Sequence, residues 1–200
     1  MQEKLQTIWK GIYNNNSGNS FKVENSNNTD AIVDNNPLAL SLYVLAYNNN
    51  SNLVNATLTL KNNLKTYLQN YMMLSDSINI KDAFVVNIGV RYEIITRPSF
   101  ASRDVLLNCN ELLKEYFKVS KRNINQPINL SEISSELDKV QGVQTVQKVE
   151  IENKQGGSYS LYAYDVKGAT RDNLVYPSQD PCFFEVKFPN TDIQGRVINI

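Results

Sequence analysis

The clearest pattern in the sequence is the alternation of apolar and polar residues from Ile78 to Ile95. Because successive side chains of a strand point to opposite faces, this run predicts a β-strand with one face in the core and the other in solvent. At about 3.3 Å per residue, an unbroken strand of this length would extend for roughly 55 to 60 Å, which is too long for a small domain. We therefore expect a bend or bulge near Asp82 or Gly89, and an end at Pro98.

Apolar residues also recur with helical spacing in three stretches. Residues 2–13 carry one apolar stripe, which predicts a short amphipathic helix that either docks on its own domain or packs on a partner outside this chain. Residues 55–72 form a second predicted helix, with Asn55 as its N-cap. The third covers residues 102–118, where Cys109 falls on the broad apolar face as a small core residue.

A shorter helix is predicted after the Gln126-Pro127 dipeptide. Asn129 and Glu132 have the spacing of a capping box, which marks the start of a helix. Gly142 suits the C′ position just beyond its last turn, where a left-handed backbone conformation is common. Both ends of this helix are therefore indicated by local signals.

Three further runs have strand character. Residues 38–47 are apolar on both sides, as in a strand that is covered on both faces. Residues 143–152 and 159–166 form two more runs, and the Gly156-Gly157 pair between them can adopt the positive φ angles of a hairpin loop. We therefore predict a β-hairpin in this part of the chain.

The order of these elements predicts an α+β fold. Residues 1–36 form an N-terminal helix and polar linker, and residues 37–166 form the core domain with the order β-α-β-α-α-β-β. This order predicts a mixed or antiparallel sheet with helices packed on one face. Residues 167–200 are a C-terminal strand-rich segment, with short strands at 183–188 and 197–200.

Composition and charge exclude several classes of partner. The chain has 20 basic and 20 acidic residues and a sequence pI near 6.3, so no net charge draws it to nucleic acid or to an anionic membrane surface. The N-terminal region has neither the apolar run of a signal peptide nor the length of a membrane span. Cys109 and Cys182 stand far apart, which favours free thiols in a reducing compartment. We predict no nucleic-acid partner and no membrane insertion.

The absence of histidine removes much of the usual catalytic chemistry. Without it there are no His-based triads, no Cys-His dyads and few possible zinc centres. Glu150 and Glu152 would share one face of a strand within the separation of a glycosidase pair, but their lysine and polar neighbours favour a solvated surface. Residues 167–170 lack the upstream glycine of a phosphate loop and predict a turn. We predict no catalytic residue, no cofactor, no metal site and no small-molecule substrate.

Aromatic residues near the C-terminus form the candidate interface. The strand at 183–188 either covers the edge of its own sheet or presents a surface to a partner, because open edge strands pair readily with other chains. The tyrosines of the 159–166 run lack the surrounding positive charge of a base-stacking platform and suit a half-buried sheet face. The candidate interface residues are Phe183, Phe184, Val186, Phe188, Tyr162 and Tyr164.

Several strings of the sequence, taken together and in order, resemble one protein family. The strings are Leu74–Val90, Asn125–Ile128, Leu137–Val146, Tyr164–Thr170 and Pro189–Arg196. They resemble the C-terminal part of the baseplate wedge proteins of T4-like contractile-tailed bacteriophages, which are relatives of the baseplate J-like proteins. The resemblance covers roughly residues 36 to 200.

The resemblance implies a structural component of the virion that is not an enzyme. It implies a protein that forms a homodimer and links neighbouring wedges into the ring around the tail tube, with other baseplate wedge proteins as partners. Such a protein is assembled in the host cytoplasm and ends in the tail baseplate. Because members of the family are much longer, we expect this chain to be a fragment or a truncated gene product.

Two alternatives from other classes of function remain. A carboxylate-dependent, tail-associated glycan hydrolase would use Glu150 and Glu152, and would need a cleft in which one carboxyl group has a raised pKa. A small peptide- or sugar-binding module would need a deep apolar pocket lined by Tyr159 or Tyr162.

Overall fold

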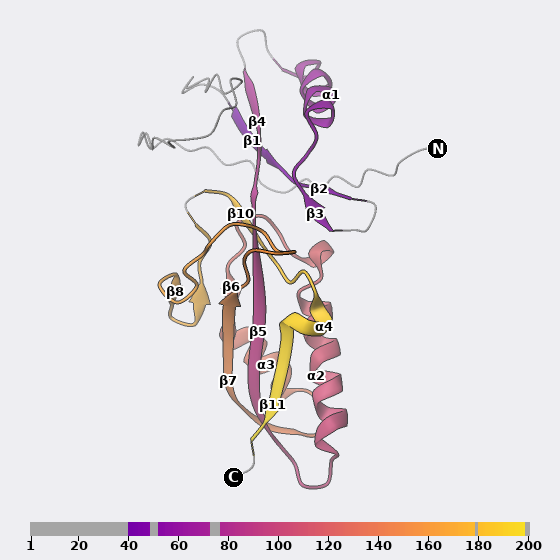
Figure 1. Ribbon diagram of the computed structural model, residues 1–200, viewed down its shortest axis with the longest axis vertical. Helices are drawn as coiled ribbons and strands as arrows, with labels where there is room; N and C mark the ends of the chain where they lie inside the picture. Colours follow the sequence, from indigo (N-terminus) through magenta and orange to yellow (C-terminus); the bar gives the residue numbers. More distant parts are fainter. Residues whose placement is uncertain (1–39, 49–51, 73–76, 179, 199–200) are drawn as a thin grey trace, which may run out of the picture. The chain divides into compact units, whose positions relative to one another are not determined.

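The computed structural model describes residues 40–48, 52–72, 77–178 and 180–198. The helix predicted at residues 2–13, and the linker that follows it, lie outside the described residues. The described residues fall into two compact units, one ending at Asp82 and the other running from Ala83 to the C-terminal end (Figure 1). This boundary differs from the predicted division, which placed one core at residues 37–166.

The first unit is a small α/β arrangement. Its elements are β1 (Leu40–Val44), β2 (Ala46–Tyr47), β3 (Leu53–Val54), α1 (Leu58–Gln69) and β4 (Ile78–Asp82). β1 pairs in parallel with β4, and β2 pairs antiparallel with β3. A small cluster around Val44, Ala46 and Ala56 receives the apolar side of α1 through Leu60 and Leu64.

The start of α1 differs from the prediction by two residues. Thr57, not Asn55, is the N-cap, and its hydroxyl accepts a hydrogen bond from the Leu60 amide at 3.3 Å. Immediately before it, the Ala56 amide donates to the Asp82 carboxylate, which also pairs with Lys61 at 2.6 Å. Asp82 thus fixes the chain entering the helix, so that the hydroxyl of Thr57 is the first side chain in position to cap it.

The second unit carries the larger sheet. Its elements are β5 (Phe84–Thr96), α2 (Ser102–Tyr116), η1 (Val119–Lys121), β6 (Ile128–Asn129), α3 (Leu130–Asp138), β7 (Val143–Asn153), β8 (Thr170–Arg171), β9 (Leu174–Val175), β10 (Cys182–Glu185), α4 (Pro189–Asp192) and β11 (Ile193–Val197).

β5 is the central strand of a mixed sheet. β7 pairs with it antiparallel over Ile88–Thr96, whereas β11 pairs with it in parallel over Val90–Ile94 and therefore lies on its opposite edge. β10 pairs in parallel with the first residues of β5, Phe84–Asn87. A separate three-stranded sheet joins β6, β9 and β8. Together with the helices, these sheets confirm the predicted α+β class.

The helices α2 and α3 pack on the sheet through one apolar layer. α2 packs against β11, and α3 packs against β7 and α2 (Figure 1). The even-numbered residues of β5 point into this layer, as the alternation predicted. The main buried residues are Val86, Ile88, Val90, Tyr92 and Ile94 from β5, Val105, Cys109 and Leu113 from α2, and Ile133 and Leu137 from α3.

Tyr92 connects β5 to α2 across the neighbouring strand. Its ring lies over Gly195 of β11, where an added Cβ would come within 2.3 Å of Cζ. Its hydroxyl donates to the Asn110 Oδ1 at 2.7 Å. A glycine in β11 is therefore needed for the tyrosine to reach the helix.

The long alternating run is interrupted once, at Ala83, where β4 ends and β5 begins. The prediction of a break near Asp82 is therefore confirmed, and β5 continues past Gly89 without interruption. The opposite face of β5, which was predicted to be in solvent, is only partly exposed. Arg91 is exposed there, but Asn87 and Gly89 are buried.

The predicted β-hairpin is wrong in its second half. β7 forms as predicted, and Gly156 and Gly157 have φ angles of 77° and 59°. Residues 159–166, however, form no strand. The Ser160 amide donates instead to a side chain of β5, Asn87 Oδ1, at 2.6 Å.

The third helix begins as predicted and ends differently. The Asn129 side chain accepts from the Ser131 and Glu132 amides, which confirms the N-cap. Gly142 has φ 95° but lies in the turn leading into β7, three residues after the C-cap Lys139, so its assignment to C′ was wrong.

The C-terminal segment belongs to the same sheet as the core. β10 ends at Glu185 rather than at residue 188, and β11 covers Ile193–Val197 rather than 197–200. Residues 199 and 200 lie outside the described part of the chain. Because both strands pair with β5, this segment completes the central sheet.

Candidate functional site

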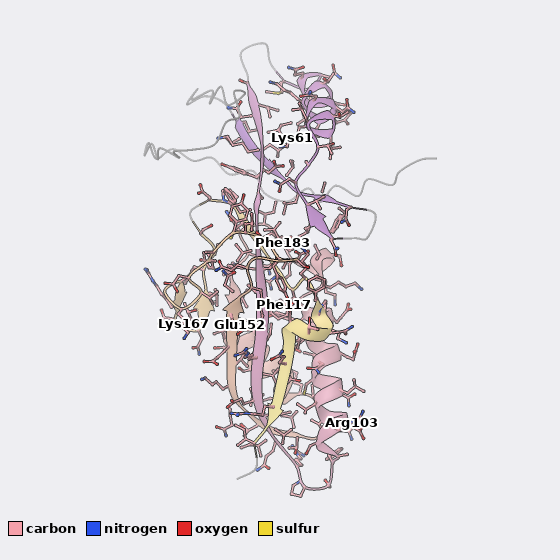
Figure 2. All side chains as sticks on the ribbon, viewed as in Figure 1. Lys61, Arg103, Phe117, Glu152, Lys167 and Phe183 are labelled. Carbon is pink, nitrogen blue, oxygen red and sulfur yellow. The ribbon has the colours of Figure 1, made fainter. Side chains whose placement is uncertain are left out.

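Three of the six predicted interface residues are buried. Phe183, Phe184 and Val186 are 3%, 3% and 6% exposed, and Phe184 and Val186 belong to the main core cluster. Figure 2 labels Phe183 on the β10 side of the second unit. β10 is hydrogen-bonded to β5 and is not an exposed aromatic strand, so these three side chains do not present a surface to a partner.

The other three predicted residues reach the surface, but each also packs within the chain. Tyr162 stacks edge-on against Phe84, with 4.7 Å between ring centroids. Tyr164 packs against Phe184, and its hydroxyl donates to the Tyr176 carbonyl. The neighbouring Leu161 is 87% exposed. No periodic pattern in the sequence singles out Leu161, because the segment that carries it is neither helix nor strand.

Phe188 and Tyr159 form a second aromatic pair, with ring centroids 5.4 Å apart. The Tyr159 hydroxyl donates to the buried Asp192 carboxylate at 2.6 Å, and this hydrogen bond raises the pKa of Tyr159. Asp192 also accepts from the Phe188 amide at 2.9 Å. The Tyr159 hydroxyl thus helps to hold α4 through Asp192.

A buried polar cluster fixes the segment that follows β7. Asn87 is 1% exposed and Glu185 is 4% exposed. The Asn87 Nδ2 donates to the Glu185 Oε2 at 2.7 Å, while its Oδ1 accepts from the Ser160 amide. The Asn87 carbonyl accepts from the Lys154 amide at 2.8 Å. One asparagine therefore joins β5, β10 and the 154–160 segment.

The candidate carboxylate pair lies on the face of the sheet opposite the helices. Glu152 pairs with Arg91 at 3.1 Å and with Lys154, and Glu150 pairs with Lys148 at 2.7 Å. Figure 2 shows Glu152 on β7 and Lys167 near β8. Gly89 leaves room for this network, since an added Cβ would meet the Lys154 side chain at 2.7 Å.

This geometry counts against the glycan-hydrolase alternative. The hydrogen bond from Lys148 lowers the pKa of Glu150, whereas a general acid needs a raised one. The Glu150 side chain is also 52% exposed, so water competes for it freely. Both carboxylates are neutralised by basic neighbours, as in a solvated surface network.

β7 has one edge that pairs with no strand in the described part of the chain. Its inner edge pairs with β5, and its register shifts at two places, so that Gln144 and Gln147 are extra residues opposite β5. Near one of these shifts, the outward-pointing Val146 amide donates to Asp138 Oδ1 at 2.9 Å. From Lys148 to Asn153 the register is uninterrupted.

The remaining candidate groups are structural. Cys109 and Cys182 are buried free thiols, and burial raises the pKa of Cys109 to about 11. Residues 166–169 form the predicted turn, in which the Gly168 amide donates to Asp165 Oδ1 at 3.0 Å. Within the described ranges, no three acidic or thiol side chains are grouped to hold a metal ion. No helix in those ranges is long and apolar enough to cross a membrane.

No protein-family model matches this chain, and no curated protein matches it either.

Proposed function

We propose that this chain is a structural component of the baseplate of a contractile phage tail, where it self-associates and contacts other wedge proteins. One observation supports the proposal above the others. The strings that resemble the wedge proteins are scattered in the sequence, yet four of them include parts of β5, β6, β7 and β11 in the second unit. Three of these strands belong to one sheet, in which β7 and β11 both pair with β5, and a resemblance that falls on paired strands supports a shared fold.

The polar side chains of the second unit are engaged in contacts within the chain, which is consistent with this role. The carboxylates that could have carried chemistry are used in ion pairs, and the buried polar groups Asn87, Glu185 and Asp192 join segments of the chain to one another. Such groups stabilise one conformation of a surface, which an assembly subunit requires. The protein then acts through the shape and edges of its sheet.

The proposal is tested on purified particles of the contractile-tailed phage whose genome encodes the chain. Mass spectrometry should detect its peptides in intact virions, in constant ratio to the tail-tube protein. Immunogold labelling should place it at the tail end distal to the head. If the peptides are absent from washed virions, or if gold marks only the capsid, the assembly role is refuted.

A further inference from the structure

The apolar stripe of α1 is only partly covered in the described part of the chain. In its first turns, Leu60 and Leu64 pack on the small buried cluster of the first unit. The stripe continues with Tyr67 and Leu68 and ends at Tyr71, just beyond the C-cap, but none of these three belongs to that cluster. Tyr67 and Tyr71 are 56% and 74% exposed, and their ring centroids are 5.2 Å apart. The second half of α1 therefore presents an exposed aromatic surface.

The buried cluster that receives α1 is small. It consists of Val44, Ala46 and Ala56, and two of these are alanines. Within the described residues, the two sheets of this unit have two strands each. Such sheets are marginally stable by themselves, and a helix in a globular protein is stabilised mainly by the packing of its apolar face. A further apolar segment packed on α1 would therefore stabilise the unit.

The sequence holds an apolar segment of matching length in residues 2–13. Its apolar residues recur at i, i+3, i+4 and i+7, and they are Leu5, Ile8, Trp9 and Ile12. In a helix, a step of seven residues extends for about 10.5 Å. The same step separates Leu64 from Tyr71 along the stripe of α1. An isolated helix as short as the predicted one is marginal in water, so it needs a surface on which to pack.

The covalent connection favours this segment over a second copy of the chain. Residues 14–39 join residues 2–13 to the start of β1, and the ends of a coil of that length lie about 30 Å apart on average. A segment tethered over such a distance has an effective concentration in the millimolar range. Pairing of two α1 surfaces would bury only Tyr67, Leu68 and Tyr71 from each copy, whereas a stable interface between proteins uses about 20 to 30 residues on each side.

We propose that residues 2–13 form an amphipathic helix that packs along the second half of α1, with Trp9 against the ring pair of Tyr67 and Tyr71. This helix covers the exposed aromatic surface and extends the apolar layer that begins at Leu60 and Leu64. The inference concerns the first unit alone, and it does not rest on the proposed function.

Trp9 reports on this contact directly, because it is the only tryptophan in the chain. In the full chain its fluorescence should be blue-shifted relative to the same chain in urea, protected from acrylamide quenching and independent of protein concentration. Tyr67→Ser combined with Tyr71→Ser should shift the emission to the red and remove most of the protection. Both tyrosines are more than half exposed and lie outside the buried cluster, so their replacement leaves that cluster intact.

Leu58→Ser is the matched control on the same helix. Leu58 is 73% exposed, and it precedes Tyr67 by nine residues, which is about two and a half turns. It therefore lies on the opposite side of α1. The substitution makes a comparable change from an apolar to a small polar side chain, and it should leave the emission of Trp9 unchanged.

Cross-linking gives a second measurement that keeps the aromatic pair in place. Ile8→Cys combined with Leu68→Cys should be joined within one chain by a short bismaleimide, and mass spectrometry should show one linker on a monomer. The natural cysteines are buried and should react slowly. Ile8→Cys combined with Leu58→Cys is the control and should be joined far less, because Leu58 lies about 15 Å from Leu68 along α1.

Three results would overturn the proposal. The first is a Trp9 emission in the full chain that equals the emission in urea. The second is a blue-shifted emission that the double tyrosine substitution leaves unchanged, or that Leu58→Ser shifts equally. The third is cross-linking at positions 8 and 68 that joins two chains, which would assign the surface of α1 to a second copy. The presence of the chain in virions tests the proposed function separately.

Discussion

Replacing Asn87 with alanine tests whether the buried polar cluster holds the 154–160 segment on the sheet. The substitution removes two hydrogen bonds made by the side chain, one to the Glu185 carboxylate at 2.7 Å and one from the Ser160 amide at 2.6 Å. A hydrogen bond to a charged group contributes about 1.5 to 3 kcal/mol and a neutral one about 1 kcal/mol. With Glu185 buried and Ser160 half-buried, we expect a loss of about 3 to 4 kcal/mol of unfolding free energy.

Urea unfolding followed by far-UV circular dichroism gives this free energy, and amide hydrogen exchange localises the change. The Ser160 and Lys154 amides should lose protection, while amides of α2 should change only through the global stability. Asn108→Ala, at an exposed position of α2, is the control and should change the unfolding free energy by less than about 0.5 kcal/mol. If Asn87→Ala costs less than about 1 kcal/mol, or if Ser160 stays protected, the cluster does not hold this segment.

Three further expectations concern other parts of the second unit. Gly195→Ala should destabilise it by about 2 kcal/mol or more, because the new Cβ would lie 2.3 Å from the Tyr92 ring, and an unchanged melting temperature would contradict the close approach. Burial holds Cys109 protonated in the folded state up to a pKa of about 11, above its ordinary value of 9.0. Its stabilising contribution should therefore be complete below pH 9 and be lost as the pH rises toward 11, a loss that Cys109→Ala should reduce in alkaline unfolding curves. Glu150→Gln and Glu152→Gln should leave peptidoglycan turbidity assays identical to those of the unmodified chain, since no hydrolysis is expected, and a clearing activity abolished by either variant would revive the hydrolase alternative.

Elements with strong local signals were predicted well. The alternation of β5, the apolar face of α2 and the Asn129 cap of α3 each depend on residues close in sequence, so the pattern alone was sufficient. The break after Asp82 was also predictable, because strand geometry limits how long a strand can be in a small domain.

Predictions that depended on distant partners failed. Residues 159–166 have the composition of a strand, but the Ser160 amide is taken by the Asn87 side chain, 73 positions earlier. The pattern at 183–188 fits either an edge of its own sheet or a surface for a partner; β10 pairs with β5, which comes about 100 residues before it, and Phe183 and Phe184 are buried. Burial of a strand depends on which neighbours it pairs with, and a single sequence does not encode that locally.

The sequence by itself determined the α+β class, the two main helices, the absence of histidine chemistry and the balance of charge, because these follow from composition and local periodicity. Only the tertiary structure decided which strand has an open edge. The aromatic strand near the C-terminus, which the sequence suggested as a candidate interface, is buried. The polar strand β7 lies at the edge of the sheet. It pairs with one edge of β5, and β11 occupies the opposite edge beside Val90–Ile94. Pairing order, rather than hydrophobicity, therefore decides which strand lies at the edge of the sheet.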